Sequence, residues 1–516
     1  MSLKLLLEEA ASRYGKKTAI TSGAVRLSYA ELDESSDKMA NALLGMGVSK
    51  GDRVAMLIPN STDFAIIYFG VVKIGAIAVT LDTKYKVGEL VSLFDHCRPK
   101  VLVTESPHLE PLVPLLPDLG YIENIIDLSA AAKGRFISYQ QIMAKAPGQR
   151  IEVGPEPEDV AHIAYTSGPT FHPRGVIVTH GRLVQAIESS ATGFQQTEND
   201  VVVLFALPMH HAVGLVVILL ASIGRGSTVV MLSSLSIDGL METIEKEAVT
   251  IFMGVPFIHA LILKQAESDG IKSDLSSIRI CASAGAPLPI SIIKRFQQHL
   301  GLRLIQFYGL TEGTAHVTCQ ALDGSGKPGS VGQALPGWQL KVVDSAGREL
   351  PPDEPGEIVI KGPIMKGYYR DTQATARAVK DGWLYTGDIG SMDEAGHLFI
   401  MGLKKPMIIC KGQNIYPSDI EAVLSSHPKV AEVAVVGIPD EVRGEVVGAA
   451  IRLKAGETAT EQQIKKFCLE RMANYKVPKQ IIFLDSLPQE NGRISKRDLR
   501  EYLLAAYSKV AGGAIP

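Results

Sequence analysis

The chain has 516 residues, of which 46% are hydrophobic and 21% are charged, and its formal net charge is −3. A chain of this length exceeds what one hydrophobic core usually serves, so we expect two or more domains. The composition is typical of a soluble globular enzyme, and the small net charge, with both signs interspersed, gives no electrostatic basis for binding nucleic acid. No cluster of basic residues would hold the chain on an anionic membrane.

The start of the chain, its apolar runs and its cysteines predict a cytoplasmic protein without a membrane span. Residues 1–15 have the apolar spacing of an amphipathic helix but lack the long apolar core of a signal peptide. The longest apolar run, residues 212–221, is far shorter than a membrane span. The five cysteines stand singly, which predicts free buried thiols instead of a disulfide framework or a zinc site. The sequence gives no prediction of the oligomeric state.

The first part of the chain alternates helices with short apolar strands. The capping box Ser28-Tyr-Ala-Glu31 predicts a helix that runs to Gly45 or Gly47. A strand at 54–58, a helix at 62–74 and a strand at 77–81 follow. Further strands are predicted at 201–206, 228–232, 251–255 and 278–282. This alternation predicts an α/β domain with a largely parallel sheet.

A loop rich in small residues connects two apolar runs, 160–164 and 176–178. It contains hydroxylated residues, two glycines, two prolines and one fixed cation, Arg174. Backbone N–H groups and hydroxyls in such a loop can face an anion, with the arginine adding positive charge. An ordinary hairpin connection explains the same residues equally well.

The composition changes after about Cys319, where glycine, proline and aspartate become frequent and the predicted strands, 340–343 and 357–360, are short. We expect a smaller β-rich subdomain there. The basic segment Gly402-Leu-Lys-Lys-Pro406 then ends in a helix breaker. A compact C-terminal α+β unit follows, with predicted helices at 417–426 and 460–473 and strands at 430–437 and 447–453. We therefore expect an N-terminal domain at 1–402 and a C-terminal lid domain at 403–516.

Five stretches together resemble the AMP-forming adenylating enzyme superfamily, of the acyl-CoA synthetase (fatty-acid or carboxylate–CoA ligase) type. They are the loop at 165–180, Pro208-Met-His-His211, Tyr308-Gly-Leu-Thr-Glu312, Tyr385-Thr-Gly-Asp388 and Lys411-Gly-Gln-Asn-Ile-Tyr-Pro417. Chance supplies one such match easily, but hardly five in the same order. The resemblance implies that ATP and a carboxylic acid form an acyl adenylate and pyrophosphate, after which coenzyme A displaces AMP.

The resemblance also implies roles for individual residues on the nucleotide side. Glu312 is expected to bind Mg²⁺, and Thr311 to donate to a phosphate oxygen. Asp388 is expected to accept from the ribose hydroxyls, unless it is an ordinary turn residue. The remaining nucleotide-binding candidates are the loop residues Thr166, Ser167, Gly168, Thr170 and Arg174, and the walls of an adenine slot, Gly285, Ala286, Pro287, Tyr308 and Gly309. A core tyrosine is the structural alternative for Tyr308.

On the acyl and thiol side, the resemblance places His211 near the reacting carboxylate, although a lone buried histidine is as often structural. Residues 213–220 would form the floor of an acyl pocket if they are helical. Lys405 matches the hinge between the domains, and Lys411 and Gly412 match the position where the thiol arm of coenzyme A passes.

Three departures from the family pattern fall at positions that the resemblance assigns to the adenylation half-reaction. Pro169 and Phe171 replace a hydroxylated residue and a glycine in the phosphate loop. Leu403 replaces an arginine that reaches the nucleotide, and Arg493 replaces the lysine that enters the site during adenylation. We expect an ATP-dependent carboxylate–CoA ligase for an apolar or fatty acid. The alternative is an adenylation-impaired member that binds an acyl-CoA or a nucleotide.

Overall fold

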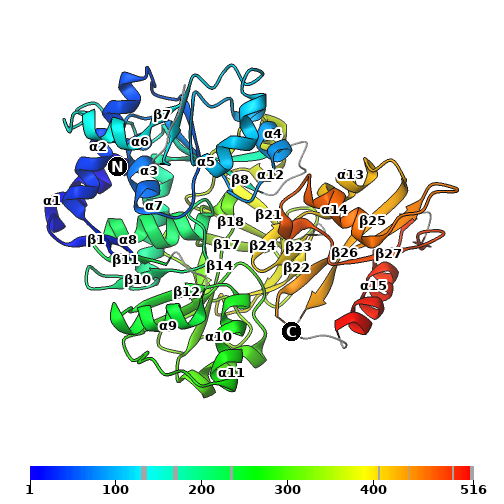
Figure 1. Cartoon of the computed structure of the whole chain (residues 1–516). Coiled ribbons are helices and arrows are strands. Elements are labelled where there is room, and N and C mark those ends of the chain that lie inside the picture. Colours follow the sequence, from blue (N-terminus) through cyan, green and yellow to red (C-terminus); the bar gives the residue numbers. More distant parts are fainter. Residues whose placement is uncertain are drawn as a thin grey trace.

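A computed structural model describes residues 1–129, 136–166, 173–232, 236–404, 407–440, 442–490 and 493–511, with the backbone alone at 489–490, 493–494, 497 and 508–511 (Figure 1). A large N-terminal α/β domain is followed by a small C-terminal domain, drawn in orange and red beside it. This arrangement confirms the predicted fold class.

The first of two large sheets has nine strands in the order β16-β15-β14-β13-β12-β10-β11-β1-β2. Neighbours from β14 to β1 are parallel, whereas β2, β15 and β16 are antiparallel additions at the edges. The bounds are β1 (Thr18–Ser22), β2 (Val25–Ser28), β10 (Val201–Leu204), β11 (Thr228–Met231), β12 (Ile251–Gly254), β13 (Ile280–Ser283), β14 (Leu304–Tyr308), β15 (Thr318–Cys319) and β16 (Gln333–Ala334).

The second large sheet has eight strands in the order β19-β9-β8-β4-β3-β5-β6-β7. It is parallel from β8 to β7, and β8 and β9 form an antiparallel pair with Thr166 opposite Arg174. The loop predicted to bind an anion therefore connects two paired strands, as a hairpin does. The bounds are β3 (Arg53–Leu57), β4 (Ile77–Thr80), β5 (Val101–Thr104), β6 (Asn124–Asp127), β7 (Ile137–Ser138), β8 (Val160–Thr166), β9 (Arg174–Thr179) and β19 (Gly367–Tyr368).

Alternate residues of the central strands enter different cores, as the two-residue period of a strand requires. Val54 and Met56 of β3 join the core between the two sheets, whereas Ala55 and Leu57 face a second core under α4. The helices are α1 (Leu3–Tyr14), α2 (Tyr29–Gly45), α3 (Thr62–Lys73), α4 (Val87–Cys97), α5 (Ser106–Leu109), α6 (Tyr139–Lys145), α7 (His180–Gly193), α8 (Ala221–Arg225), α9 (Ile237–Lys246), α10 (Pro256–Ser268), α11 (Ile290–Leu300) and α12 (Thr372–Ala378).

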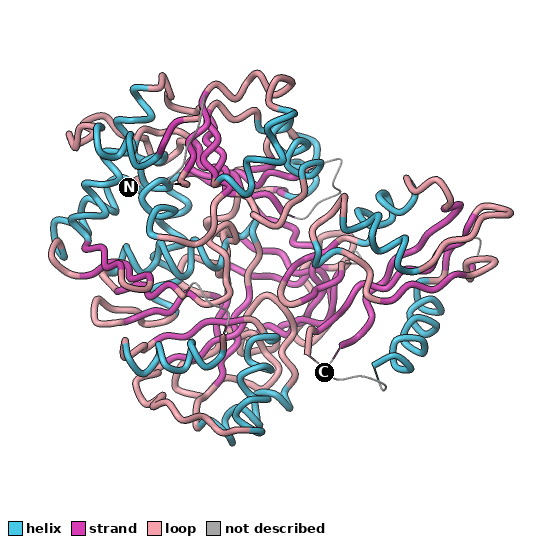
Figure 2. Tube along the Cα trace, in the orientation of Figure 1, coloured by secondary structure: helices cyan, strands magenta, loops and turns pink. Residues whose placement is uncertain are grey.

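The predicted β-rich subdomain is an antiparallel sheet that completes the large domain. Its five strands are β17 (Gln339–Val343), β18 (Gly356–Lys361), β20 (Val379–Lys380), β21 (Trp383–Met392) and β22 (Leu398–Leu403). Figure 2 shows these strands in magenta between the two large sheets and the small domain. Strand β21 carries Asp388, so this subdomain supplies one of the predicted site residues.

The small domain has two hydrophobic cores of its own, one on each side of its sheet. Its elements are β23 (Ile408–Cys410), β24 (Gln413–Ile415), α13 (Pro417–Ser425), β25 (Val430–Asp440), β26 (Gly444–Leu453), α14 (Glu461–Leu469), β27 (Gln480–Phe483), β28 (Gln489–Glu490), β29 (Arg493–Ile494) and α15 (Lys496–Ala511). All five cysteines of the chain are free and buried, as predicted. Within the described residues, no helix is both long and apolar enough to cross a bilayer.

Two helical segments differ from the prediction. The capping box at Ser28 and Glu31 forms and α2 ends at Gly45 as expected, but α14 ends at Leu469 instead of Ala473. The backbone N–H of Ala473 donates to Glu89 of the large domain and its conformation is extended, so the helix cannot continue through it. Val213–Leu220 is helical, and it is buried from Gly214 onward, but it is a π-helix, η2, a form that often marks functional sites.

Candidate active site

The predicted residues of the adenine slot lie where parallel strands of the first large sheet end, which is where open α/β sheets bind ligands. Tyr308 is the last residue of β14, and its hydroxyl donates a 2.5 Å hydrogen bond to the carboxylate of Asp388 on β21. Gly285, Ala286 and Pro287 follow the neighbouring strand β13. The backbone of Gly285 has a φ of +81°, a conformation that favours glycine. The structure thus brings Tyr308 and Asp388 together.

The turn after β14 requires a glycine and presents two polar side chains. A Cβ on Gly309 would lie 1.5 Å from the carbonyl oxygen of Ala315, so no side chain fits there. Thr311 and Glu312 then begin a short 3-10 helix, η3 (Thr311–Gly313). The motif is therefore a tight turn that places a hydroxyl and a carboxylate beside the end of the sheet.

Glu312 of η3 interacts with side chains from two other elements, β19 and β9. The hydroxyl of Tyr368 on β19 donates to its carboxylate across 3.0 Å. Burial raises the pKa of Glu312, and the positive charge of Arg174 on β9 opposes that shift. The Arg174 guanidinium lies 5.7 Å from the centre of the Tyr368 ring, a cation–π distance. Tyr368 was not among the predicted residues, because no sequence signal shows that β19 pairs with β9.

Asp388 is a half-buried carboxyl with few compensating partners. Burial raises its pKa to about 6, and the hydrogen bond from Tyr308 acts in the opposite direction. Its backbone N–H donates to the hydroxyl of Thr386 across 3.0 Å, which fixes the strand locally. Such a carboxyl is well suited to accept hydrogen bonds from a diol, because ligand hydroxyls would replace the water it has lost.

His211 lies at the start of the π-helix and contacts the small domain. Its Nε2 forms a 3.1 Å hydrogen bond with the side-chain oxygen of Gln413, in β24. Burial lowers the pKa of His211, whereas the charge of Asp82 and the bond with Gln413 act in the opposite direction. Gly214 permits this packing, since a Cβ there would lie 2.3 Å from the carbonyl oxygen of Pro208. Gln413 belongs to a motif that the sequence singles out, but no role was predicted for it.

The turn between β23 and β24 lies against the large domain. Gly412 has a φ of +78°, and a Cβ on it would lie 2.7 Å from Val255 Cγ1. The Lys411 Nζ lies 4.7 Å from the centre of the Phe257 ring. Val255 and Phe257 stand at the N-terminal end of α10. The predicted coenzyme A residues are thus at the interface of the two domains, close to the His211–Gln413 bond.

Four of the predicted site residues, and the side chain of a fifth, fall outside the part of the chain that the structure describes. Ser167, Gly168, Thr170 and Lys405 lie outside the described residues. Thr166 ends β8 opposite Arg174. The backbone of Arg493 is in β29, which pairs with β28 of the small domain, and its side chain is outside the described part. Lys496, the nearest other cation in the sequence, forms an ion pair with Glu421 at 3.4 Å.

In the described part of the chain, no group of three or more histidine, cysteine, aspartate or glutamate side chains is arranged to hold a metal ion. Glu312 supplies a single carboxylate. That donor set fits Mg²⁺ bound chiefly through phosphate oxygens and water, which is how this ion usually accompanies a nucleotide.

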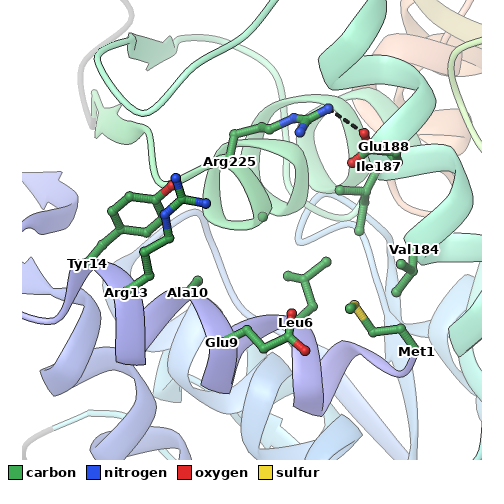
Figure 3. A pocket seen from close by; sticks show the side chains of 11 residues that line it. Met1, Leu6, Glu9, Ala10, Arg13, Tyr14, Val184, Ile187, Glu188 and Arg225 are labelled. Carbon is green, nitrogen blue, oxygen red and sulfur yellow. Dashed lines mark hydrogen bonds and ion pairs between the residues drawn. The ribbon is translucent and has the colours of Figure 1, made fainter.

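A hollow on another surface of the large domain shares none of these residues. Figure 3 shows it between α1, α7 and α8, with Leu6, Ala10 and Ile187 among its lining side chains. The Arg225 guanidinium donates to the Glu188 carboxylate at its rim. The hollow therefore lies apart from the cleft around Glu312.

Comparisons with known proteins agree with the geometry. The model of the AMP-binding enzyme family matches residues 7–369, and that of the AMP-binding enzyme C-terminal domain matches residues 419–492. The long-chain-fatty-acid–CoA ligase of Bacillus subtilis is 33% identical over 530 aligned positions, which cover 97% of this chain and 94% of that protein.

Two solved structures have the same sequence identity to this chain but superpose on it to different degrees. The double mutant of o-succinylbenzoate CoA synthetase (MenE) from Bacillus subtilis, bound with its product analogue OSB-NCoA, is 30% identical with a TM-score of 0.86 and covers 96% of this chain and 98% of its own. ATP-bound MatB from Rhodopseudomonas palustris is also 30% identical, covers 98% of this chain and 100% of its own, and has a TM-score of 0.73.

Proposed function

Since the chain belongs to the AMP-binding enzyme family, in which it is a carboxylate–CoA ligase of the acyl-CoA synthetase type, we propose that it activates an apolar acid, such as a fatty acid, with ATP and passes the acyl group to coenzyme A. The observation that carries the proposal is that Asp388, bonded to Tyr308, lies within electrostatic reach of Glu312, while His211 contacts Gln413 of the small domain.

In the first step a carboxylate oxygen of the acid attacks the α-phosphorus of ATP, and the bond to pyrophosphate breaks. Asp388 would accept from the ribose hydroxyls, and Tyr308 would lie against the adenine. Thr311 and Arg174 would stabilise negative charge on the phosphates, which is the main demand of phosphoryl chemistry. Bound Mg²⁺, held by Glu312, would neutralise phosphate charge.

In the second step the sulfur of coenzyme A attacks the acyl carbonyl carbon, the thiol proton is lost, and the bond to AMP breaks. The turn at Lys411 and Gly412 lies close to the large domain. A Cβ added to Gly412 would be 2.7 Å from Val255 Cγ1. A glycine at 412 lets the turn approach α10 this closely, and we infer that the extended thiol arm passes beside it. Lys411 is the cation nearest to that turn and would face the phosphates of coenzyme A.

The orientation of the small domain supports the acyl-transfer arrangement. His211, the residue proposed to lie near the reacting carboxylate, contacts Gln413 of the β23–β24 hairpin. The adjacent Gly412 turn, where the thiol arm is proposed to pass, lies against Val255 of the large domain.

The apolar character of the acid is inferred from η2. All residues of this π-helix from Gly214 to Leu220 are buried and none is charged. A carboxylate held near His211 would have its chain directed toward this apolar element. The Bacillus subtilis relative is named for long-chain fatty acids, which favours a fatty acid here.

We assign residues 1–402 to the N-terminal domain and 403–516 to the lid, with a hinge near Lys405, and we infer that the enzyme acts in the cytoplasm. The separate cores support the boundary, since the described cores of the large domain end at residue 398 or earlier and the first small-domain core begins at Ile408.

The test is ATP–pyrophosphate exchange and acyl-CoA formation across saturated fatty acids of graded length, with Asp388→Ala as the inactive control. Exchange and acyl-CoA formation with one or more acids supports the ligase. The departures at Pro169, Phe171, Leu403 and Arg493 make an adenylation-impaired protein the second candidate. Absence of exchange together with tight binding of an acyl-CoA would establish that candidate instead.

A further inference from the structure

A buried ion pair joins the two domains through residues outside the β23–β24 hairpin. Glu89 lies in the first turn of α4 in the large domain, and Lys476 ends the short 3-10 helix η4 (Asn474–Lys476) in the small domain. The Lys476 Nζ is 2.5 Å from Glu89 Oε1, and the two side chains are 5% and 3% exposed. The pair links residues 387 positions apart in the sequence.

Both carboxylate oxygens of Glu89 are engaged. Oε2 accepts the backbone N–H of Ala473 across 3.1 Å and the backbone N–H of Lys86 across 3.0 Å. The Lys476 Nζ also lies 5.5 Å from the centre of the Tyr85 ring. Two of the three hydrogen bonds to Glu89 therefore come from the small domain, and only the Lys86 bond belongs to the cap of α4.

Inside one domain a buried ion pair affects the stability of the fold. At an interface between two domains that move, it affects their relative orientation instead. Removing one partner while the interface stays closed leaves an uncompensated buried charge, which is strongly unfavourable. If the small domain turns away, both charges regain water and the fold of each domain is unaffected. The pair therefore contributes mainly to the choice between orientations of the small domain.

The orientation that forms this pair is the one that closes the cleft. In the same arrangement Gln413 contacts His211, and the Gly412 turn lies against Val255. These contacts come from the β23–β24 hairpin, whereas Lys476 follows α14. The small domain is thus held at two separate places.

We propose that Glu89 and Lys476 are positioning residues for the acyl-transfer step: their ion pair holds the small domain in the orientation in which the β23–β24 hairpin closes on His211. The pair must separate when the domain turns for adenylation. This inference rests on the proposed two-step reaction.

The test measures adenylation and acyl transfer separately in two single variants, Glu89→Gln and Lys476→Met. Glu89→Gln keeps the shape of the side chain and an oxygen for the cap of α4, and Lys476→Met leaves α4 untouched. We expect acyl transfer from a preformed acyl adenylate to coenzyme A to slow by about tenfold or more, because the closed orientation loses a buried charge pair. ATP–pyrophosphate exchange should stay the same or become faster.

The matched control is Glu8→Gln. Glu8 is also buried and pairs with Lys4, at 2.9 Å, but both residues lie in α1 of the large domain. This variant should leave the ratio of the two half-reaction rates unchanged. Equal slowing of both half-reactions in the Glu89 and Lys476 variants, or unchanged acyl transfer, would overturn the proposal.

A second measurement does not depend on catalysis. Spin labels on Glu110→Cys and Ala455→Cys, which are exposed positions in the two domains, report their separation, and the native cysteines are buried. In Glu89→Gln we expect the distance distribution to broaden or shift relative to the labelled parent. An identical distribution would overturn the proposal, whereas absence of exchange in the unmodified enzyme would count against the proposed function alone.

Discussion

The hydroxyl of Tyr308 and the carboxylate of Asp388 are joined across 2.5 Å, and this bond ties the end of β14 to β21 of the antiparallel subdomain. It would also tie the residue proposed to lie against the adenine to the residue proposed to bind the ribose. Burial raises the pKa of Asp388 to about 6, and the Tyr308 bond limits that rise. The affinity for nucleotide should therefore depend on pH.

We predict that the KM for ATP rises as the pH falls through about 6. In the proposed role Asp388 accepts from the ribose hydroxyls as a carboxylate, so the affinity for ATP should be fully present above the pKa of Asp388, about 6, and be lost below it. The rise should be about tenfold between pH 7 and pH 5, following protonation of one group. Steady-state kinetics with a pH-stable acid substrate measures it.

Tyr308→Phe is the control for this pH effect. Tyr308→Phe keeps the aromatic ring but removes the hydrogen bond that lowers the pKa of Asp388. The acid limb, which is the rise of the KM for ATP at low pH, should therefore move to higher pH. An acid limb that stays in place, or moves to lower pH, would contradict the assignment of that limb to Asp388.

Much of the fold follows from the sequence, because local signals produce it. The box at Ser28 and Glu31 forms a capped helix, and the apolar runs become parallel strands within one or two residues of the predicted bounds. The contacts of Glu312 with Tyr368 and of His211 with Gln413 do not follow from it. They join segments 56 and 202 residues apart, and they depend on strand pairing and domain orientation that no local pattern encodes.

We predict that Tyr368→Phe raises the Mg²⁺ concentration needed for half-maximal activity without abolishing activity. The Tyr368 hydroxyl orients the Glu312 carboxylate and lowers its pKa, so its loss leaves the carboxylate less well placed and more readily protonated. Loss of an outer partner of a metal ligand typically costs about tenfold or more in metal affinity. Titrating Mg²⁺ at fixed ATP should show this increase, and Glu312→Gln should show a larger one. Equal Mg²⁺ dependence in Tyr368→Phe and the parent would exclude this role.

We predict that Gly412→Ala slows acyl transfer far more than adenylation. The new Cβ would lie 2.7 Å from Val255 Cγ1, so the turn could not approach α10 as closely, and the φ of +78° adds strain. Rapid-quench measurement of thioester formation should show a fall of about tenfold or more, as backbone misplacement at a reacting centre typically produces. Adding Val255→Ala removes the clash but not the strain, so it should restore only part of the rate. No recovery would show that the contact with Val255 is not the cause.

We predict that Gly214→Ala destabilises the large domain. Its Cβ would lie 2.3 Å from the carbonyl oxygen of Pro208, within a segment where neither η2 nor the preceding turn can move freely. Overpacking of this kind lowers the free energy of unfolding by about 1–3 kcal/mol. Denaturant unfolding followed by circular dichroism measures the change. Gly45→Ala, at the end of α2 where nothing lies within 4 Å of the added atom, is the control and should leave stability unchanged or slightly raised, because alanine favours the helix more than glycine does.

The last prediction concerns Leu403, which lies directly opposite Asp388 in the antiparallel pair of β21 and β22. Opposite residues of such a pair project to the same face, with Cβ atoms about 4.5–5.5 Å apart. An arginine at this position would place a positive charge beside the half-buried carboxyl and lower the pKa of Asp388. Leu403→Arg should therefore move the acid limb of the ATP KM profile to lower pH and raise the exchange rate near pH 6. Leu403→Gln, which is polar but uncharged, should leave the limb in place. If the arginine variant raises neither the exchange rate nor the affinity for ATP, this departure from the family pattern does not limit turnover.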